Sequence, residues 1–576
     1  MNAELAAVFE RIADMLEISG ADAFRINAYR RVARVIRDLT DDVRTLHEAG
    51  VLRELSGIGK ATAEKIEEFL TTGKIKLHEE LRKKVPDSLI ELLGIQSLGP
   101  KKVAMIHRQL GVRNLDDLGA AIESGTLEQL PGMGKQSVQR IADGLAFLRA
   151  SKLRTPYGIA APKVEALLAM TRSIPGVEQA VVAGSFRRGA ETVGDLDILC
   201  VSDDGPATVQ AFVNKSNPVR VLAAGKTKGS IIASLAGDRE IQVDLRVVGS
   251  ESFGAALQYF TGSQAHNVRL RERAVGRGWK LNEWGLFDGE KPIAGRTESD
   301  IYARLDLPCF PPEVREDRFE FEDGFDPEAL IAGAQLRGDL HTHTTASDGK
   351  NTIEQMARAA RQRGYEYLVI TDHSKSAVIA NGLSIERLRA HIAAIREIDR
   401  ATDGITLLAG TECDILPDGS LDYPDEVLRA CDLVVASIHM AMDKGVRSPT
   451  QRTLSAIANR YVTIIGHPTG RLISRRRPMD LDMGAIVQAA ADNHTAIEIN
   501  ASWQRLDAND VHARQALCAG AWLSIDTDAH RTDDLDRINL GIMTARRAGV
   551  TTDRVINALP LDQLRKWIQR KRSATA

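Results

Sequence analysis

Residues 336–349 read LRGDLHTHTTASDG, a short strand-like run that ends in two histidines and is followed by an aspartate. Side chains alternate between the two faces of a strand, so His341 and His343 point the same way and can bind one cation. The stretch therefore predicts a metal site at the end of a strand, provided that other segments supply further ligands.

The segments that follow continue this pattern, because nearly every predicted strand ends in His, Asp or Glu. They read YLVITDHS (367–374), LLAGTECDI (407–415), LVVASIHM (433–440), VTIIGHPTGR (462–471), AIEINAS (496–502) and LSIDTDAH (523–530). Alternating strands and helices predict an α/β barrel or layered fold; in a barrel, parallel strands end at one rim that carries the active site. One buried histidine would be structural, but successive strand ends predict a metal centre. The expected ligands are His341, His343, Asp348, His373, Glu412, His439, His467, Asp528 and His530.

A second group of strands, in the middle of the chain, carries three carboxylates. In GSFRRGAETVGDLDIL (184–199) Asp195 and Asp197 alternate with apolar residues, and Asp244 has the same setting in IQVDLRVV (241–248). Oxygen ligands on neighbouring strands suit Mg²⁺ and two-metal phosphoryl transfer. Asp-x-Asp pairs on edge strands are often only solvated, but the preceding Gly-Ser-x-x-Arg offers Ser185, backbone amides and Arg188 to a triphosphate.

Residues 1 to about 150 show helical periodicity, with almost no strand signal, and contain an internal repeat. The segments LSGIGKATAEKI (55–66), IQSLGPKKVAMI (95–106) and LPGMGKQSVQRI (130–141) resemble helix-hairpin-helix motifs. Glycine permits close approach, and helix N-terminal amides attract phosphate. One such turn would be an ordinary helix connection, but three predict contact with a DNA backbone without base readout. The residues expected to make it are Gly57, Gly59, Lys60, Gly99, Gly132, Gly134 and Lys135.

Composition excludes several classes of protein. The 576 residues are too many for one core and predict about three to four domains. With 75 Lys and Arg against 78 Asp and Glu, the net charge is −3, so nucleic-acid contact must come from local basic patches. Five cysteines without a CxxC pair argue against a disulfide scaffold or a zinc ribbon, and no apolar run is long enough to span a membrane. We therefore expect a cytoplasmic, nucleoid-associated protein without membrane contact.

On these motifs, residues 1–318 resemble the family X DNA polymerases of the nucleotidyltransferase superfamily. GSFRRGAETVGDLDIL matches the palm signature, and LQYFTGSQAHNVRLRERAVGRGWKLNEWGLF (257–287) matches the thumb. The resemblance implies that Asp195 and Asp197 bind both metals, Mg²⁺ or Mn²⁺, and that Asp244 binds the catalytic one and activates the primer 3′-hydroxyl. Core packing is the commoner fate of adjacent aromatic residues, but Tyr259 and Phe260 are expected to lie against the sugar. The full set implied to contact the nucleotide, its base pair or the template is Ser185, Arg188, Gly194, Tyr259, Phe260, Gly262, Asn267 and Arg271.

The strand-end ligands resemble those of the polymerase and histidinol phosphatase (PHP) domain, over about residues 336–576, with all nine ligands of that family present. The resemblance implies up to three ions, commonly Mn²⁺ or Zn²⁺, and hydrolysis of phosphoesters. Just past His467, GRLISRRRP (470–478) brings arginines to the same rim. A charge run is usually a solvated loop, but beside a phosphoesterase centre we expect Arg471, Arg475 and Arg476 to contact a DNA backbone.

The helix after the first hairpin raises the question of a further activity. Family members with 5′-deoxyribose-phosphate lyase activity use a lysine in this helix, and Lys65 falls on that position. A lysine of lowered pKa could form a Schiff base with an abasic sugar. However, an accompanying lysine of the family pattern is Ala61 here, and an exposed helix lysine is usually only solvated or phosphate-bound. The sequence leaves this activity open.

The predicted architecture is multidomain: an all-α helix-hairpin-helix region, an α+β nucleotidyltransferase palm and thumb, and a distorted TIM-like PHP barrel. The expected boundaries are 1–80 (lyase-like), 81–150 (fingers), 151–250 (palm), 251–318 (thumb), 319–335 (linker) and 336–576 (PHP). The expected function is a monomeric DNA-directed DNA polymerase that uses dNTPs to fill short gaps in gapped or primer-template DNA during base-excision or end-joining repair, with a metal-dependent 3′–5′ exonuclease. The alternatives are a DNA-tethered phosphoesterase whose polymerase half mainly binds DNA, a DNA-binding scaffold, and a barrel that acts on a small phosphorylated amino alcohol.

Overall fold

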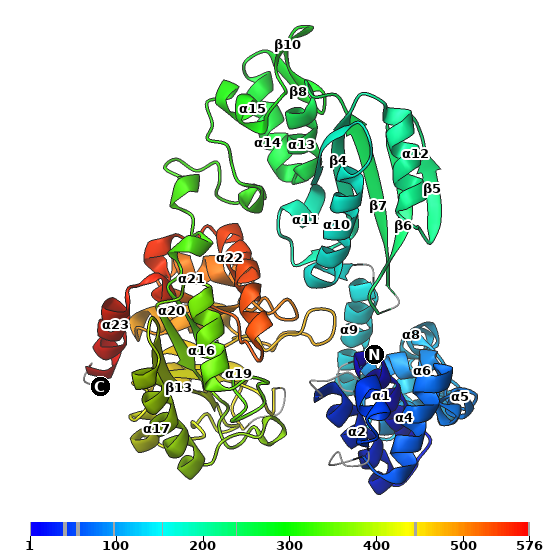
Figure 1. Cartoon of the computed structure of the whole chain (residues 1–576), viewed down its shortest axis with the longest axis vertical. Coiled ribbons are helices and arrows are strands. Elements are labelled where there is room, and N and C mark those ends of the chain that lie inside the picture. Colours follow the sequence, from blue (N-terminus) through cyan, green and yellow to red (C-terminus); the bar gives the residue numbers. More distant parts are fainter. Residues whose placement is uncertain are drawn as a thin grey trace. The chain divides into compact units, whose positions relative to one another are not determined.

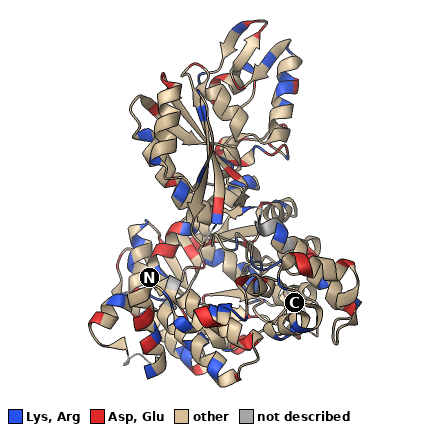
Figure 2. Ribbon diagram, turned by 90° about the vertical axis from the view of Figure 1, so that its right-hand side faces the viewer, with Lys and Arg blue, Asp and Glu red and all other residues tan. Residues whose placement is uncertain are grey.

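The computed structural model describes residues 2–38, 43–52, 58–95, 98–152, 154–237, 239–442 and 446–573. The chain divides into two compact units: Met1–Lys152 with Ser474–Arg477 form the first, and Leu153–Ile473 with Pro478–Ala576 form the second. No helix in the described ranges combines the length and the apolar character needed to cross a membrane. Lys and Arg are interspersed with Asp and Glu over the ribbon (Figure 2).

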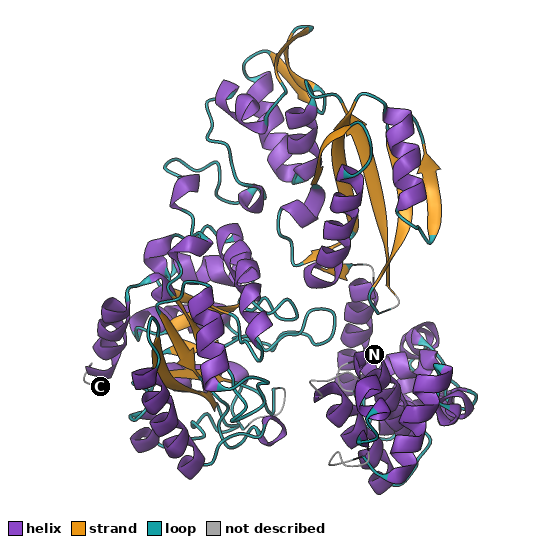
Figure 3. Cartoon of the chain, viewed as in Figure 1, coloured by secondary structure: helices purple, strands orange, loops and turns teal. Residues whose placement is uncertain are grey.

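Between residues 2 and 152, the described residues of the first unit form helices joined by turns (Figure 3). Leu5, Phe9, Ile12 and Leu16 recur every three to four residues along the first helix and are buried in the core of this unit. The predicted all-α region is thus confirmed. Its α-helices are α1 (Asn2–Ile18), α2 (Ala23–Asp38), α3 (Val43–Glu48), α4 (Lys60–Thr72), α5 (Lys76–Arg82), α6 (Asp87–Ile90), α7 (Pro100–Leu110), α8 (Leu115–Glu123) and α9 (Lys135–Lys152).

The second unit begins with a five-stranded sheet in the order β2-β4-β7-β6-β5. Only β4 and β7 pair in parallel among these strands; the other three pairings are antiparallel. Helices α10 and α12 pack against the sheet (Figure 1). The elements are β1 (Thr155–Pro156), α10 (Tyr157–Arg172), β2 (Val177–Val182), α11 (Gly184–Arg187), β3 (Thr192–Val193), β4 (Asp195–Ser202), α12 (Gly205–Lys215), β5 (Arg220–Ala224), β6 (Lys228–Leu235) and β7 (Arg239–Val248).

A smaller α+β part follows, with the three-stranded antiparallel sheet β10-β9-β8. Its elements are α13 (Phe253–Thr261), α14 (Gln264–Val275), β8 (Trp279–Asn282), β9 (Gly285–Asp288), β10 (Lys291–Ala294) and α15 (Glu298–Arg304). The segment after it, whose acids and prolines predict a linker, packs onto this part. Phe319 is buried, and the buried His266 contacts Glu320 Oε1 through Nδ1 at 2.9 Å and the Tyr302 hydroxyl through Nε2 at 2.8 Å. A hydrophobic cluster that includes Phe319 and Leu330, together with these buried hydrogen bonds, thus holds a stretch whose composition alone indicates a linker.

The C-terminal part is a barrel of seven parallel strands in sequence order, β11 to β17. An isolated parallel bridge between Thr342 and Ala529 brings the first strand against the end of the last. Helices surround the strands (Figure 1), so the predicted TIM-like barrel is confirmed. The elements are β11 (Gly338–Thr342), α16 (Ile353–Gln362), β12 (Tyr367–Ile370), α17 (Ile385–Ala401), β13 (Thr406–Asp414), α18 (Asp425–Leu428), β14 (Leu433–Ser437), α19 (Pro449–Ala458), β15 (Ile464–Ile465), α20 (Met483–Asp492), β16 (Ala496–Asn500), α21 (Asp510–Cys518), β17 (Trp522–Asp526), α22 (Ile538–Arg547) and α23 (Leu561–Ser573).

Candidate active sites

The three middle carboxylates come from the parallel strand pair β4 and β7. Asp197 stands opposite Asp244 in the register of the two strands, and Asp195 stands opposite Gln242. The apolar residues that alternate with them, such as Leu196, are fully buried on the other face of the sheet. The strand pair therefore brings the predicted carboxylates together on one face.

The surroundings set the protonation of two of these carboxylates. Burial and two neighbouring carboxylates raise the pKa of Asp197 to about 6. Burial also acts to raise the pKa of Asp244, but hydrogen bonds from Lys228, Ser230 and Gln242 outweigh it and lower the pKa below its usual value. The Lys228 ammonium lies 2.7 Å from Asp244 Oδ2 and partly neutralises the group. Clustered carboxylates of this kind fit divalent cations, which would favour the ionised form of Asp197.

The turn between β2 and α11 brings part of the predicted triphosphate site next to Asp197. Gly184 has φ +65°, and a Cβ at this position would lie 2.9 Å from Asp197 Oδ2. Only glycine lets the start of α11 approach the carboxylate this closely. Ser185 follows in α11 and is half-buried, and Gly194, directly before β4, is exposed.

Arg188 links this turn to helix α13. Its Nε donates to Glu316 Oε1 at 3.0 Å, and Nη1 donates to the Thr261 carbonyl oxygen at 2.5 Å. Gly262, with φ +69°, follows directly, and a Cβ there would lie 3.2 Å from Arg188 Nη1. The guanidinium is therefore held at the C-terminal end of α13, beside the turn predicted to contact the sugar.

The other predicted nucleotide contacts surround this turn. Tyr259 and Phe260 are half-buried, with ring centroids 5.1 Å apart, and the Arg246 guanidinium carbon lies 4.2 Å from the centre of the Phe260 ring. Asn267 is largely buried, and its amide donates to the Tyr259 carbonyl oxygen at 2.8 Å. Arg271 is exposed. The tyrosine and phenylalanine rings thus contact each other while keeping part of their surface accessible.

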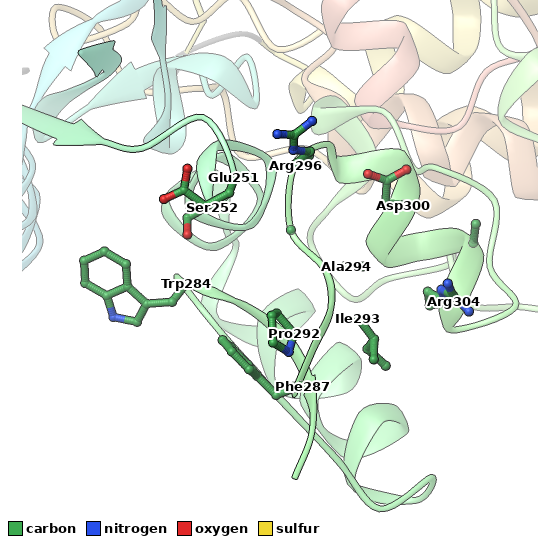
Figure 4. A pocket seen from close by; sticks show the side chains of 12 residues that line it. Glu251, Ser252, Trp284, Phe287, Pro292, Ile293, Ala294, Arg296, Asp300 and Arg304 are labelled. Carbon is green, nitrogen blue, oxygen red and sulfur yellow. The ribbon is translucent and has the colours of Figure 1, made fainter. Parts of the chain in front are cut away.

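A cavity of about 630 Å³ lies nearby, between the β8–β10 sheet and α15 (Figure 4). Trp284 and Phe287 border it on the sheet side, and Arg296 and Arg304 border it on the helix side. Neither the palm carboxylates nor the strand-end histidines are among its lining residues. This cavity is therefore separate from both predicted centres.

The nine predicted strand-end ligands meet at the carboxyl ends of the barrel strands. Candidate ligand atoms lie within 4.8 Å of one another in three groups: His343, Asp348, His373 and His530; His341, His343 and Asp528; and His373, Glu412 and His439. The ninth residue, His467, has its Nε2 2.9 Å from Glu412 Oε1. Because His343 and His373 are each shared by two groups, the residues form one continuous centre.

The donor atoms of this centre fit metal ions. His343 Nδ1 and His467 Nδ1 are buried without hydrogen-bond partners, which is costly unless something binds them. Burial lowers the pKa of His343 to about 4, so its ring is neutral and can ligate. Burial acts to raise the pKa of Glu412, but neighbouring imidazoles outweigh it and hold the pKa well below its usual value. A neutral imidazole at His343 beside ionised carboxylates suits Mn²⁺ or Zn²⁺.

Three further residues support this centre and were not predicted. Asp414 Oδ1 lies 2.6 Å from His439 Nδ1, and Glu498 Oε1 lies 2.6 Å from His341 Nδ1. Carboxylates in this position fix the orientation and tautomer of ligating histidines. The centre opens into a cavity of about 540 Å³, which His373, Glu412 and His439 line. Arg505 lines this cavity too, and its Nη1 has no hydrogen-bond partner. The sequence does contain a hint of Asp414 and Glu498, because both carboxylates stand within the predicted strand segments LLAGTECDI and AIEINAS.

The predicted DNA-binding glycines lie at helix starts in the first unit. Gly59 precedes α4, Gly99 precedes α7 and Gly134 precedes α9, while Gly132 has φ +74° in the turn before Gly134. A Cβ added at any of these four positions would meet nothing within 4 Å. Internal packing therefore does not demand glycine there. The positive φ favours glycine at Gly132, whereas close approach of a ligand would demand it at the other three positions. Lys60 and Lys135 are exposed at the first positions of α4 and α9. Gly57 falls outside the described residues.

The remaining predicted cations differ in their surroundings. Arg471 is largely buried and donates to the carbonyl oxygens of residues 505 and 506, at 2.8 and 2.6 Å. These contacts within the barrel argue against a free DNA-binding arginine at this position. Arg475 is exposed and Arg476 is half-buried. Lys65 is half-buried, and its Nζ donates to the carbonyl oxygen of residue 61, one turn earlier in α4, at 3.1 Å.

Five family descriptions match successive parts of the chain. They are a helix-hairpin-helix domain (1–75), a SAM-like helix-hairpin-helix tandem (89–146), the DNA polymerase beta palm (161–271), the DNA polymerase beta thumb (256–316) and the PHP domain (339–502). The chain is 37% identical over 572 residues to the DNA polymerase/3′-5′ exonuclease PolX of Bacillus subtilis (strain 168), covering 98% of this chain and 99% of that protein. It is 27% identical over 342 residues to DNA polymerase lambda of Rattus norvegicus, covering 55% and 56% of the two chains. It is also 29% identical over 245 residues to a probable phosphatase of Caldanaerobacter subterraneus, covering 41% of this chain and 91% of that protein.

Proposed function

We propose that the palm carboxylates of this chain, which belongs to the bacterial family X DNA polymerases, carry nucleotide addition. We propose further that its PHP centre removes 3′-terminal nucleotides. The chain is a DNA-directed DNA polymerase with a 3′–5′ exonuclease activity, and its substrates are DNA and dNTPs. Both activities depend on divalent metal ions.

The observation that carries the assignment of the polymerase site is the pairing of Asp197 with Asp244 across β4 and β7. Asp195 and Asp197 would hold two ions, and Asp244 would share the one nearer the primer. When bound, such ions neutralise the triphosphate and lower the pKa of the primer 3′-hydroxyl. The Lys228 ammonium, 2.7 Å from Asp244 Oδ2, must move away to admit an ion there. We propose Mg²⁺ or Mn²⁺ for this site, because its ligands are all oxygens.

The incoming nucleotide would lie between the Gly184 turn and the end of α13. Arg188 is held there by Glu316 and by the Thr261 carbonyl oxygen. Its remaining N–H groups would bind the triphosphate together with Ser185 and the amide of Gly194. The other proposed contacts are Tyr259, Phe260 and Gly262 to the sugar, Asn267 to the base pair and Arg271 to the template.

The exonuclease would use the PHP centre. Its nine ligands would hold up to three ions, for which we propose Mn²⁺ or Zn²⁺, and these ions would supply an activated water and a positive charge beside the scissile phosphate. Arg505 would bind a phosphate oxygen, since its unpartnered Nη1 belongs to a residue that lines the cavity. Glu498 and Asp414 would hold His341 and His439 in the tautomers that leave Nε2 free to ligate.

We propose that the biological substrate is a short gap in duplex DNA. The glycine turns before α4, α7 and α9 would hold the phosphate backbone on both sides of the gap without reading bases. This arrangement suits a monomeric repair enzyme, associated with the nucleoid, in base-excision or end-joining repair. Lyase action by Lys65 on 5′-deoxyribose phosphate is part of the same proposal.

A one-nucleotide-gapped duplex tests both centres in one reaction. We expect the protein in Mn²⁺ to extend the primer with dNTPs and to shorten it without them. Asp197→Ala should abolish extension and keep shortening, and His343→Ala should do the reverse. If both variants lose both activities, the two centres are not independent. If the wild-type protein extends nothing, the assignment of the palm fails.

A second candidate for the barrel is hydrolysis of a small phosphate monoester. It is favoured by the match to probable phosphatases, each of which aligns with 41% of this chain. Single-stranded DNA should inhibit hydrolysis of p-nitrophenyl phosphate if DNA is the substrate of the barrel. Hydrolysis that single-stranded DNA leaves unchanged would favour the small substrate.

A further inference from the structure

An exposed apolar loop tip lies at the edge of the PHP centre. Val378 and Ile379, in the loop between β12 and α17, are 80% and 87% exposed. Both line the same 540 Å³ cavity as the metal-ligating candidates His373, Glu412 and His439. Single exposed apolar residues are common on protein surfaces and need no explanation. Two adjacent ones at the edge of a strongly charged cavity are unusual.

The loop that carries this tip is firmly tied at its base. A Cβ on Gly382 would lie 1.9 Å from the Ser374 carbonyl oxygen, so the two arms of the loop are pressed together. The Leu383 amide donates to the His373 carbonyl oxygen at 2.8 Å. Asn381 has φ +54°, and its amide donates to the carbonyl oxygen of residue 346 at 3.2 Å. The apolar tip is therefore presented on a fixed support.

The support is also joined to the metal centre itself. Ser376 Oγ donates to Asp414 Oδ2 at 2.5 Å, while Asp414 Oδ1 lies 2.6 Å from His439 Nδ1. The Ser376 amide donates to Asp422 Oδ2 at 2.7 Å. The position of the tip relative to His439 is thus fixed through one intervening carboxylate.

The two walls of the cavity suit different parts of a nucleotide. The ionic wall, with Arg505, Glu412 and Asp528, is suited to ions and a phosphodiester, whereas Val378, Ile379 and the adjacent alanines offer an apolar surface. A cavity of about 540 Å³ falls in the range that accommodates one small ligand. Apolar side chains that insert beside a base separate it from its neighbour in the stack.

We propose that the Val378–Ile379 tip packs against the nucleobase of the 3′-terminal nucleotide and holds it away from the preceding base while its phosphodiester lies at the metal ligands. The inference rests on the proposed exonuclease function and adds a determinant of its substrate: a 3′ end that carries a base. The contact is apolar, so it recognises any of the four bases.

The test compares two single strands in Mn²⁺ with the full-length protein. One ends in a normal nucleotide, and the other ends in a tetrahydrofuran abasic residue with a free 3′-hydroxyl. We expect the wild-type protein to remove the normal end about tenfold faster at low substrate, a ratio that corresponds to roughly 1.4 kcal/mol. The double variant Val378→Ser/Ile379→Ser should remove both ends at the rate at which the wild-type protein removes the abasic end. Its KM for the normal end should rise, while its kcat stays unchanged.

Two controls separate recognition from damage to the centre. Val446→Ser changes a valine of the same domain that is 88% exposed and does not line the cavity, and should keep the preference. The double variant Val378→Ile/Ile379→Val keeps an apolar tip and should therefore keep the wild-type ratio of the two removal rates. If the serine variant keeps the preference, or slows removal of both ends equally, the inference is wrong while the exonuclease assignment stands. If the wild-type protein shortens neither strand, the exonuclease assignment itself fails and the inference fails with it.

Discussion

Replacing Glu498 with glutamine probes how the barrel prepares its histidine ligands. Glu498 Oε2 accepts the His467 backbone amide at 2.5 Å and the Asn500 side-chain amide at 3.2 Å, while Oε1 lies 2.6 Å from His341 Nδ1. Because two donors face Oε2, the glutamine carbonyl oxygen should remain there and the new NH₂ group should face His341 Nδ1. Two donors cannot pair, so the His341 proton should move to Nε2, the nitrogen that otherwise faces the metal ligands.

The size of the effect follows from this change of tautomer. A protonated Nε2 cannot ligate, and removing the partner of a ligating histidine typically costs about 10- to 100-fold in metal affinity or activity. That range corresponds to roughly 1.4 to 2.7 kcal/mol. Glu498 is fully buried, and burial raises the pKa of its carboxyl. A neutral side chain of equal size should therefore leave the fold intact.

The assay is the Mn²⁺ concentration that gives half-maximal shortening of a 3′ end. Glu498→Gln should raise it about 10- to 100-fold while dNTP extension of the gapped duplex stays at the wild-type level. Glu366→Gln, the same change at an exposed residue of the barrel that pairs with Arg337, should alter neither activity. An unchanged Mn²⁺ requirement in Glu498→Gln would refute the tautomer argument.

Three other substitutions make separate predictions. Gly184→Ala would place a Cβ 2.9 Å from Asp197 Oδ2 at a positive φ; strain of this kind costs about 1–3 kcal/mol, so extension should fall by about tenfold or more while shortening is unchanged. Burial lowers the pKa of His266. As pH drops below the pKa of about 6.5 that His266 has in the unfolded chain, the unfolded chain therefore binds a proton that the folded thumb does not, and the stability of the thumb should fall. His266→Gln should remove this dependence in limited proteolysis of the thumb across that pH range; an equally steep pH profile in the variant would contradict the assignment. Borohydride should trap the wild-type protein, but not Lys65→Ala, on DNA with a 5′-deoxyribose phosphate. Lys74→Ala, at an exposed lysine just past the end of α4, serves as the control and should still be trapped. Trapping of Lys65→Ala would place the lyase elsewhere.

The cluster of candidate ligands in the barrel could be predicted because parallel strands of a barrel end at one rim. In an alternating pattern of strands and helices, every His, Asp or Glu at a strand end is a candidate, and the nine residues from His341 to His530 lie together. The same holds for Asp195, Asp197 and Asp244, whose positions follow from the two-residue period of a strand. Residues within regular strands can thus be assigned to a site directly from the sequence.

Contacts made by loops and by residues behind the ligands could not be predicted in this way. Asp414 and Glu498 lie in predicted strands, but only the folded barrel shows that each carboxylate reaches a particular histidine nitrogen. Arg471 belongs to a basic run, yet its guanidinium bonds to carbonyl oxygens within the barrel, which composition does not reveal. Phe319 stands in a segment with the composition of a linker and is nevertheless buried. In each case the partner is remote in sequence, so no local pattern indicates it.

The closure of the barrel between Thr342 and Ala529 has a consequence for biosynthesis. The first strand supplies His341 and His343, whereas Asp528 and His530 follow the last strand, so the centre combines residues from opposite ends of the domain. During translation the palm and its carboxylates are completed before most of the barrel has left the ribosome. A nascent chain therefore acquires the means to add nucleotides first, and acquires the means to remove them only when its last strand has been made.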